Sequence, residues 1–214
     1  MSGTGPYLHL TMQLEHQRDF SAELKLARAL LTVGQSEQQA AAAEKYCSEA
    51  AQLCLARWAA LPPLVAQSHV PLLHTFQQLV EVQEAAAVVS ALQSSSGKSA
   101  ADVSTTFDTW RHRMPNMWDD MGVWHDVLGW RLVVFEKLAL QQSKPKKESA
   151  PTPSGPPPGS NETAFTLNQL AHAARLHKLR NVCQRTLTAV VRVTSLHSDE
   201  LFAKAREQVF LLSS

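Results

Sequence analysis

The 214-residue chain balances 20 lysines and arginines against 19 aspartates and glutamates, so its net charge of +1 gives no bulk attraction for nucleic acid or anionic membrane. Hydrophobic residues make up 44% and charged residues 18%, a composition too apolar for a disordered protein. Cys47, Cys54 and Cys183 lack close pairing and suit a reducing compartment, and we expect neither a secretion signal nor a membrane span because no long apolar run occurs.

The first part of the chain reads as three helices separated by proline and glycine. Apolar spacing predicts a helix over 20–31, and a capping box that begins at Ser36 opens a second helix over 36–61. A pair of prolines ends that helix. Pro71 suits the first turn of the next helix, which we expect over 71–92, because the first turn leaves its N–H groups unpaired.

Four of the five tryptophans fall between Trp110 and Trp130. A short helix leads into this segment, and Pro115 separates it from a longer predicted helix over 119–142. The apolar side chains of the longer helix follow steps of three or four residues and share one stripe: Met121, Trp124, Leu128, Leu132, Phe135 and Leu138. We expect most of the tryptophan surface to be buried between helices, although the run 132–135 could alternatively form a buried strand.

Residues 143–162 contain six of the eleven prolines and few apolar side chains. Such a stretch cannot offset its ordering entropy, so we predict a flexible linker. Lys144, Lys146 and Lys147 form a small basic cluster in it, either a nuclear-import signal or the ordinary solvation of a loop. Thr152 precedes a proline there and could be phosphorylated.

Helical periodicity returns after the linker. We predict helices over 165–178, 181–193 and 198–212, the last with an apolar stripe formed by Phe202, Ala205, Val209 and Leu212. The predicted fold is all-α, an α-solenoid of antiparallel helix pairs that runs over 1–142 and continues over 163–214. No strict repeat length is visible, so a discrete helical bundle stays the alternative.

Five residues carry the most recognisable spacing in the chain: Trp110, Arg113, Trp124, Leu128 and Arg131. This spacing resembles the FAT region, the helical-repeat segment that precedes the kinase domain in the phosphatidylinositol 3-kinase-related kinases. In that family an arginine near the first tryptophan is followed eleven residues later by a second tryptophan, and an arginine follows seven residues after that, as they do here. The resemblance covers about residues 55–212 and is strongest over 109–131, where the sequence is most similar to the kinase-dead branch of the family.

The resemblance implies a scaffold with no catalytic, cofactor-binding or metal-binding residues. The implied role is that of a nuclear adaptor that holds histone acetyltransferase complexes together and receives transcription activators. Two other functions stay open, namely a FAT segment that braces an active kinase domain and a free-standing helical adaptor.

Several residues imitate chemical sites. Gly97-Lys98-Ser99 lacks the earlier glycine and the preceding strand of a phosphate-binding loop. Asp119, Asp120, His125 and Asp126 are metal-ligand types, but they lack a His-x-x-x-His or Glu-x-x-His spacing. We interpret the two adjacent aspartates as the acidic first turn of their helix.

Two histidine pairs are five residues apart: His69 with His74, and His172 with His177. This spacing places the two members of each pair on different helix faces, which argues against a shared catalytic role. Cys47 and Cys54 share a helix face, and we expect buried structural thiols. No Gly-x-Ser-x-Gly, His-Arg-Asp or Asp-Phe-Gly motif occurs, so we expect no enzyme activity in this chain.

Trp118 lies off the apolar stripe and close to Pro115, and it is our candidate for a partly exposed contact with a partner protein. Alternatively, the tryptophans could line an exposed aromatic groove. The helical spacing of Trp124 favours core packing for that residue.

Overall fold

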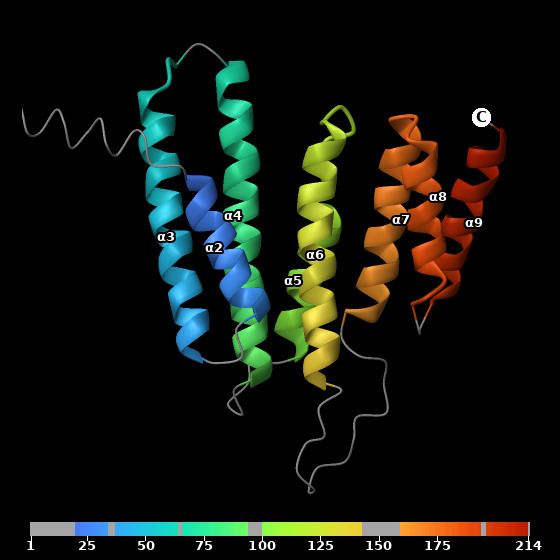
Figure 1. Ribbon diagram of the computed structural model, residues 1–214, viewed down its shortest axis with the longest axis horizontal. Helices are drawn as coiled ribbons and strands as arrows, with labels where there is room; N and C mark the ends of the chain where they lie inside the picture. Colours follow the sequence, from blue (N-terminus) through green and yellow to red (C-terminus); the bar gives the residue numbers. More distant parts are fainter. Residues whose placement is uncertain are drawn as a thin grey trace, which may run out of the picture. The chain divides into compact units, whose positions relative to one another are not determined.

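The computed structural model describes residues 20–33, 37–63, 66–93, 100–142, 159–193 and 196–213, and these ranges contain helices and turns but no strand (Figure 1). The all-α class is therefore confirmed. None of the helices in these ranges has both the length and the hydropathy that a bilayer span requires. The described helices belong to two compact units, Met1–Lys98 and Ser99–Ser214.

The first unit contains α2 (Phe20–Val33), α3 (Glu37–Ala60) and α4 (Ala66–Gln93), and each of these helices packs on the other two. Consecutive helices run antiparallel (Figure 1). The core side of α3 is built from small side chains at steps of three and four: Ala43, Cys47, Ala50 and Cys54, all essentially inaccessible to solvent. The two thiols are buried within the core, as their spacing predicts.

The start of α4 differs from the prediction. The helix begins at Ala66, so Pro71 lies inside it and not in its first turn. A proline at this point removes one backbone hydrogen bond near the helix start, which a long helix with a packed face tolerates. Thr75 is buried one turn later, and its hydroxyl donates to the Pro71 carbonyl at 3.1 Å.

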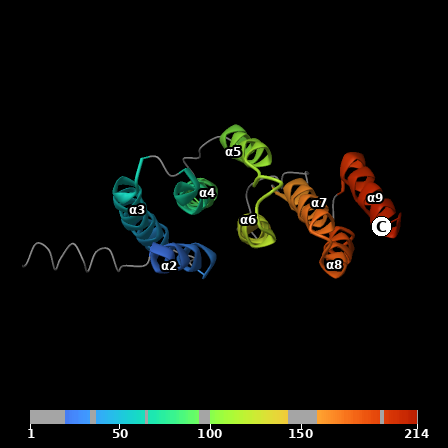
Figure 2. The ribbon, with the colours of Figure 1, turned by 90° about the horizontal axis from the view of Figure 1, so that it is seen from above.

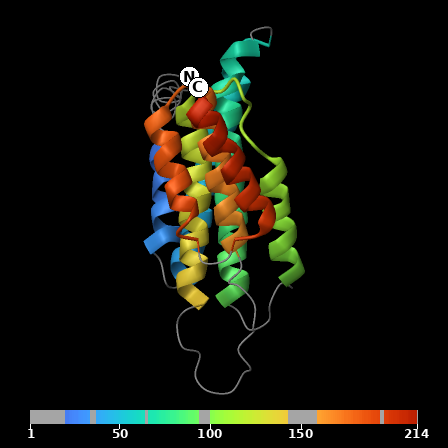
Figure 3. The same cartoon turned by 90° about the vertical axis from the view of Figure 1, so that its right-hand side faces the viewer.

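The described residues of the second unit form five helices: α5 (Ala100–His112), α6 (Met121–Gln142), α7 (Ser160–Leu176), α8 (Arg180–Val190) and α9 (Ser198–Ser213). The helix α6 packs on α7, and α7 packs in turn on α8 and α9. Figure 2 shows α7 between α6 and the pair formed by α8 and α9, and Figure 3 views the unit from the side of α9, which lies in front. Neighbours along the chain from α6 to α9 are antiparallel, so each unit is built from the helix pairs that an α-solenoid requires.

Asp120 caps α6 and Asp119 closes the turn before it, so neither aspartate lies in the first turn of the helix. Asp120 accepts a hydrogen bond from the Gly122 N–H at its Oδ1 atom (2.6 Å), and its carbonyl accepts from Val123 at 2.9 Å. Asp119 accepts from the Asn116 N–H at 2.8 Å. The helix therefore begins two residues later than predicted, because an N-cap residue satisfies its first N–H groups without being helical itself.

The helix α7 begins earlier than predicted. It starts at Ser160, so the last three residues of the predicted linker, 160–162, are helical. Gly159 precedes it with a φ of 92°, and a Cβ atom there would lie 3.1 Å from the Phe135 ring. The Gly159 carbonyl accepts from both the backbone N–H and the hydroxyl of Thr163, each at 2.9 Å.

The apolar stripe of α9 faces away from the core of its unit. Phe202 is 72% exposed, and Val209 and Leu212 are also largely exposed. The buried face instead contains Glu200 and Glu207. The spacing thus predicted the helix correctly, but the side that packs on α7 has carboxylates whose partners come from α7.

Candidate functional site

The Trp-Arg motif is a clamp that ties the end of α5 to α6. Arg131 is 2% exposed, and its guanidinium donates from Nη1 to the Trp110 carbonyl at 2.8 Å and from Nη2 to the Arg113 carbonyl at 2.5 Å. The Trp110 carbonyl is in the last turn of α5 and the Arg113 carbonyl follows directly after the helix, where helix geometry supplies no intrahelical donor. Arg113 therefore contributes its backbone to the clamp, while Arg131 contributes its side chain.

The Trp110 ring lies directly beneath this clamp. The Arg131 guanidinium is 5.7 Å from the centre of the ring. The Trp110 ring also packs against two other aromatic rings, those of Phe107 and Phe135, whose centroids lie 5.8 Å and 5.9 Å from its own. Such separations are favourable for tilted ring pairs, so this part of the motif is a packed core and not a groove.

Trp124 and Leu128 pack against α7. They form a buried cluster with Val127, Leu170 and Ala173. The indole N–H of Trp124 donates to the Asn116 carbonyl at 3.1 Å, so the ring also fixes the loop between α5 and α6. The alternative of a groove lined by all the tryptophans does not fit these positions, because Trp110, Trp124 and Trp130 are buried.

Trp118 is 88% exposed, far more than the partial exposure that its sequence position suggests. A hydrogen-bonded turn holds it in this position. The Asn116 side-chain oxygen accepts from the Trp118 N–H at 3.1 Å, and the Asn116 carbonyl accepts from the Asp119 N–H at 2.9 Å. The indole is thus displayed by an ordered turn, which reduces the entropy that a partner would have to remove on binding.

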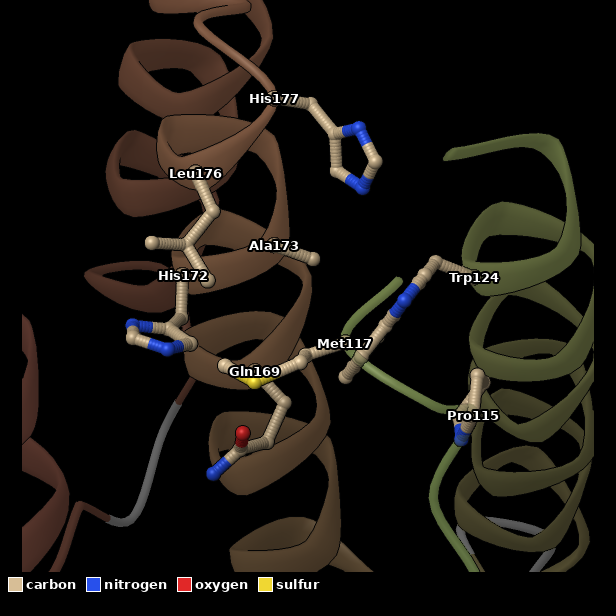
Figure 4. Close-up of a pocket in the computed structure, with 8 residues that line it drawn as sticks. All are labelled: Pro115, Met117, Trp124, Gln169, His172, Ala173, Leu176 and His177. Atoms are coloured by element: carbon tan, nitrogen blue, oxygen red, sulfur yellow. The ribbon is translucent and has the colours of Figure 1, made fainter. Parts of the chain in front are cut away.

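A hollow of about 200 Å³ lies beside this turn (Figure 4). Its walls come from the loop after α5, the start of α6 and the last part of α7: Pro115, Met117, Trp124, Gln169, His172, Ala173, Leu176 and His177. Met117 and Trp124 point toward the α7 side chains across the hollow. Its lining mixes apolar and aromatic side chains with the polar groups of Gln169, His172 and His177, and the described lining residues include no carboxylate. A mixed lining of this kind can receive a side chain of a partner protein.

Two histidines belong to the lining of this hollow. The helix α7 ends at Leu176, and the N–H of its C-cap residue His177 still donates to the Ala173 carbonyl at 3.0 Å. The five-residue separation therefore places the His172 and His177 rings on different sides of α7 (Figure 4). His172 is also engaged on its other side, where its Nδ1 atom lies 3.0 Å from Glu207 Oε1.

Glu207 is the centre of a buried ionic cluster that the sequence did not reveal. The carboxylate is 1% exposed and accepts from Arg175 Nε at 2.7 Å, with Arg206 Nη2 at 3.4 Å. Burial alone would raise the pKa of Glu207, but the hydrogen bonds from Arg175 and His172 together hold this pKa below its usual value. The cluster joins α7 to α9 and positions the His172 ring at the hollow.

Two further polar contacts between helices were not predicted from the sequence. Arg111 and Glu162 form a two-pronged ion pair at 2.6 Å and 3.0 Å, which links α5 to the first turn of α7. Asn168 donates from its amide to the Glu200 carboxylate at 2.8 Å and to the Glu200 carbonyl at 2.9 Å. Nothing in the local sequence marks these residues, because each looks like an ordinary surface position until its partner is known.

The remaining candidates are structural or lie elsewhere. Burial raises the pKa of the Cys47 thiol to about 11 and also raises those of Cys54 and Cys183, so these buried thiols are poor nucleophiles. The described residues hold no cluster of three metal-ligand side chains. The basic cluster of Lys144, Lys146 and Lys147, the Gly97-Lys98-Ser99 motif and Thr152 lie outside the described residues.

Comparison with known proteins gives a match to the FAT domain family over residues 4–210. The chain is 36% identical over 200 residues to the SAGA complex/NuA4 acetyltransferase complex subunit Tra1 of Schizosaccharomyces pombe, a match that covers 85% of this chain and 5% of that protein. It is 31% identical to the corresponding TRA1 subunit of Saccharomyces cerevisiae, with 84% of this chain and 5% of that protein covered.

A third relative is the transformation/transcription domain-associated protein (TRRAP) of Mus musculus, 30% identical over 176 residues that cover 81% of this chain and 7% of the mouse protein. The chain therefore spans a small fraction of the length of the proteins it matches. The matches extend over both units and over the motif from Trp110 to Arg131.

Proposed function

Because this chain belongs to the FAT domain family, we propose that it is a non-catalytic scaffold segment of a TRRAP-like subunit of histone acetyltransferase complexes. In this proposal its partners are other protein subunits of the complex and transcription activators, and it works in the nucleus. It uses no cofactor and makes no direct contact with nucleic acid or membrane.

The observation that carries the proposal is the display of Trp118. Protein interfaces depend on a few large aromatic anchors, and tryptophan is prominent among them. Here an ordered turn presents an almost fully exposed indole beside a hollow of about 200 Å³ with a mixed apolar and polar lining. The buried tryptophans nearby stabilise the support, so the same segment provides both a rigid base and a contact.

The test replaces Trp118 by alanine in the full-length protein at its natural expression level. We expect the amount of at least one co-purifying subunit or activator, measured by quantitative mass spectrometry, to fall by about tenfold, which corresponds to the loss of one aromatic anchor. The thermal stability should not change, because the indole contributes little to the folded core.

Leu55→Ala is the matched control, because Leu55 is an exposed apolar residue in the other unit. It should leave the set of co-purifying proteins unchanged. If Trp118→Ala also leaves every partner in place, Trp118 is not a contact. If no acetyltransferase subunit co-purifies with the unaltered protein, the assignment to such a complex is wrong.

A further inference from the structure

A second surface lies at the corner where α7 meets α8. It is a hollow of about 420 Å³ lined by Arg175, Lys178, Arg180 and Leu211, and we call this set the basic corner. The charged side chains among the described residues of the lining are all cationic. Three cations at one concave place are unusual for a chain whose overall charge is only +1.

The cations of the basic corner differ in how they are balanced. Arg175 is neutralised by Glu207 and stacked on the Phe210 ring, whose centre lies 5.0 Å from the guanidinium. Lys178 and Arg180 are exposed, and neither pairs with a carboxylate among the residues that the structure describes. The corner thus has two charges available to a partner.

The backbone fixes the position of Lys178. This residue has a φ of 60°, and it is the one non-glycine residue with a positive φ in the described ranges. Its N–H donates to the Arg175 carbonyl at 2.9 Å, and the next N–H, of Leu179, donates to the Ala174 carbonyl at 2.8 Å. This is the hydrogen-bond pattern of a Schellman helix end, where glycine is the usual residue. The lysine is held at this corner at a cost in backbone energy.

Apolar side chains surround the charges. Leu211 lines the hollow, and the half-exposed Phe210 packs on Arg175. Leu179, which lies between Lys178 and Arg180 in the sequence, is exposed. A nucleic acid backbone offers phosphates but no aliphatic side chains to cover such a surface, and it needs a longer row of cations. An amphipathic protein segment offers both carboxylates and apolar side chains.

From this charge complementarity we propose that the basic corner binds an acidic amphipathic segment of a partner protein, with carboxylates on Lys178 and Arg180 and an apolar side chain against Leu211. This inference rests on the proposed scaffold function, and it names the chemistry of one partner that such a scaffold would hold.

The test measures binding of a short fluorescein-labelled peptide, with glutamate and leucine at helical spacing, to the 214-residue chain by fluorescence anisotropy. Replacing the glutamates of the peptide by glutamine, or its leucines by serine, should each weaken binding by about tenfold. Affinity should also fall when the salt concentration rises from about 0.05 M to 0.3 M, because exposed charges are screened.

The double variant Lys178→Gly with Arg180→Gln should weaken binding of the same peptide by about tenfold. The matched control is Arg185→Gln with Arg192→Gln, which removes two exposed charges outside the hollow and should change the affinity less than about twofold. Circular dichroism melts of both variants establish that they fold.

Equal losses in the two double variants would show a response to net charge alone and overturn the proposal. So would equal binding of the glutamine peptide, or tighter binding of a single-stranded oligothymidylate than of the acidic peptide. If the peptide does not bind while acetyltransferase subunits still co-purify, the basic corner is wrong and the scaffold function stands. If the peptide binds but no acetyltransferase subunit co-purifies, the basic corner stands and the scaffold function is wrong.

Discussion

The helices α6 and α9 have the same apolar spacing and opposite environments. In α6 the stripe that includes Trp124, Leu128 and Phe135 is buried against neighbouring helices. In α9 the stripe that includes Phe202 and Val209 is exposed, and α7 packs on the other side. Periodicity therefore identifies a helix and its apolar face, but whether that face is covered depends on which neighbours the chain supplies.

The buried side of α9 explains how the unusual arrangement is stable. Glu207 and Glu200 occupy positions that apolar residues would normally fill, and each has its partners on α7, namely Arg175 and His172 for Glu207 and Asn168 for Glu200. Paired carboxylates can be buried because the hydrogen bonds offset the loss of hydration. The apolar side is thereby left available for contacts with other protein surface.

The largest expected effect tests the buried stripe. Trp124→Ala should lower the free energy of unfolding by about 3–5 kcal/mol, because it removes a large buried side chain and leaves a cavity against α7. Urea denaturation measures the change. Phe202→Ala on α9 is the matched substitution and should change stability by less than about 0.5 kcal/mol. Similar losses in both variants would mean that the two stripes are equally buried.

A somewhat smaller effect concerns the clamp beside that stripe. Arg131→Met should cost about 2–4 kcal/mol, because it removes two hydrogen bonds from a charged donor to the carbonyls of Trp110 and Arg113. The exposed Arg185 on α8 offers the control, and Arg185→Met should be nearly neutral in the same urea titration. A neutral Arg131→Met would show that the clamp contributes no stability.

The ionic side of α9 makes a prediction about pH. The pKa of Glu207 is lower in the folded protein than its ordinary value of 4.5, so its contribution is fully present above that value and is lost as the pH falls through the folded pKa. At pH 7 Glu207→Gln should cost about 1–3 kcal/mol. The difference from the unaltered protein should shrink as unfolding is measured at decreasing pH, and a difference independent of pH would contradict the assignment.

The smallest effect has the opposite sign. Lys178→Gly should stabilise the chain by about 0.5–1 kcal/mol, because glycine adopts a positive φ without the contact that a Cβ atom makes. Arg185→Gly, inside α8, should instead destabilise by about 1 kcal/mol. If Lys178→Gly stabilises the chain and also weakens its binding of the acidic peptide, the lysine is retained for binding at the expense of stability.

The sequence predicted the helices well because helix formation depends on nearby residues. The starts of α4, α6 and α7 moved by two to five residues, since Pro71 is tolerated inside a helix and Asp120 caps one without joining it. Resemblance to the FAT family also identified Trp110 and Arg131, although their contact, between residues 21 positions apart, became visible only in the fold.

The rest of the site depends on long-range pairing. Glu207 looks like a surface residue of an amphipathic helix, and only the approach of Arg175, 32 residues earlier, makes its burial possible. His172 and His177 both line the hollow beside Trp124, although their rings lie on different sides of α7. The roles of Trp118 and of Lys144, Lys146 and Lys147 stay predictions, since exposure or composition does not identify a partner.

The Arg131 clamp also has a consequence for local motion. The last turn of a short helix normally frays, with its amide hydrogens exchanging through small, independent openings. Here the end of α5 and the residue after it cannot open without breaking both hydrogen bonds from the buried guanidinium of Arg131 on α6. The end of α5 and the centre of α6 should therefore open together as one cooperative unit. The amide hydrogens at the end of α5, directly before the turn that presents Trp118, should then exchange as slowly as those of the core.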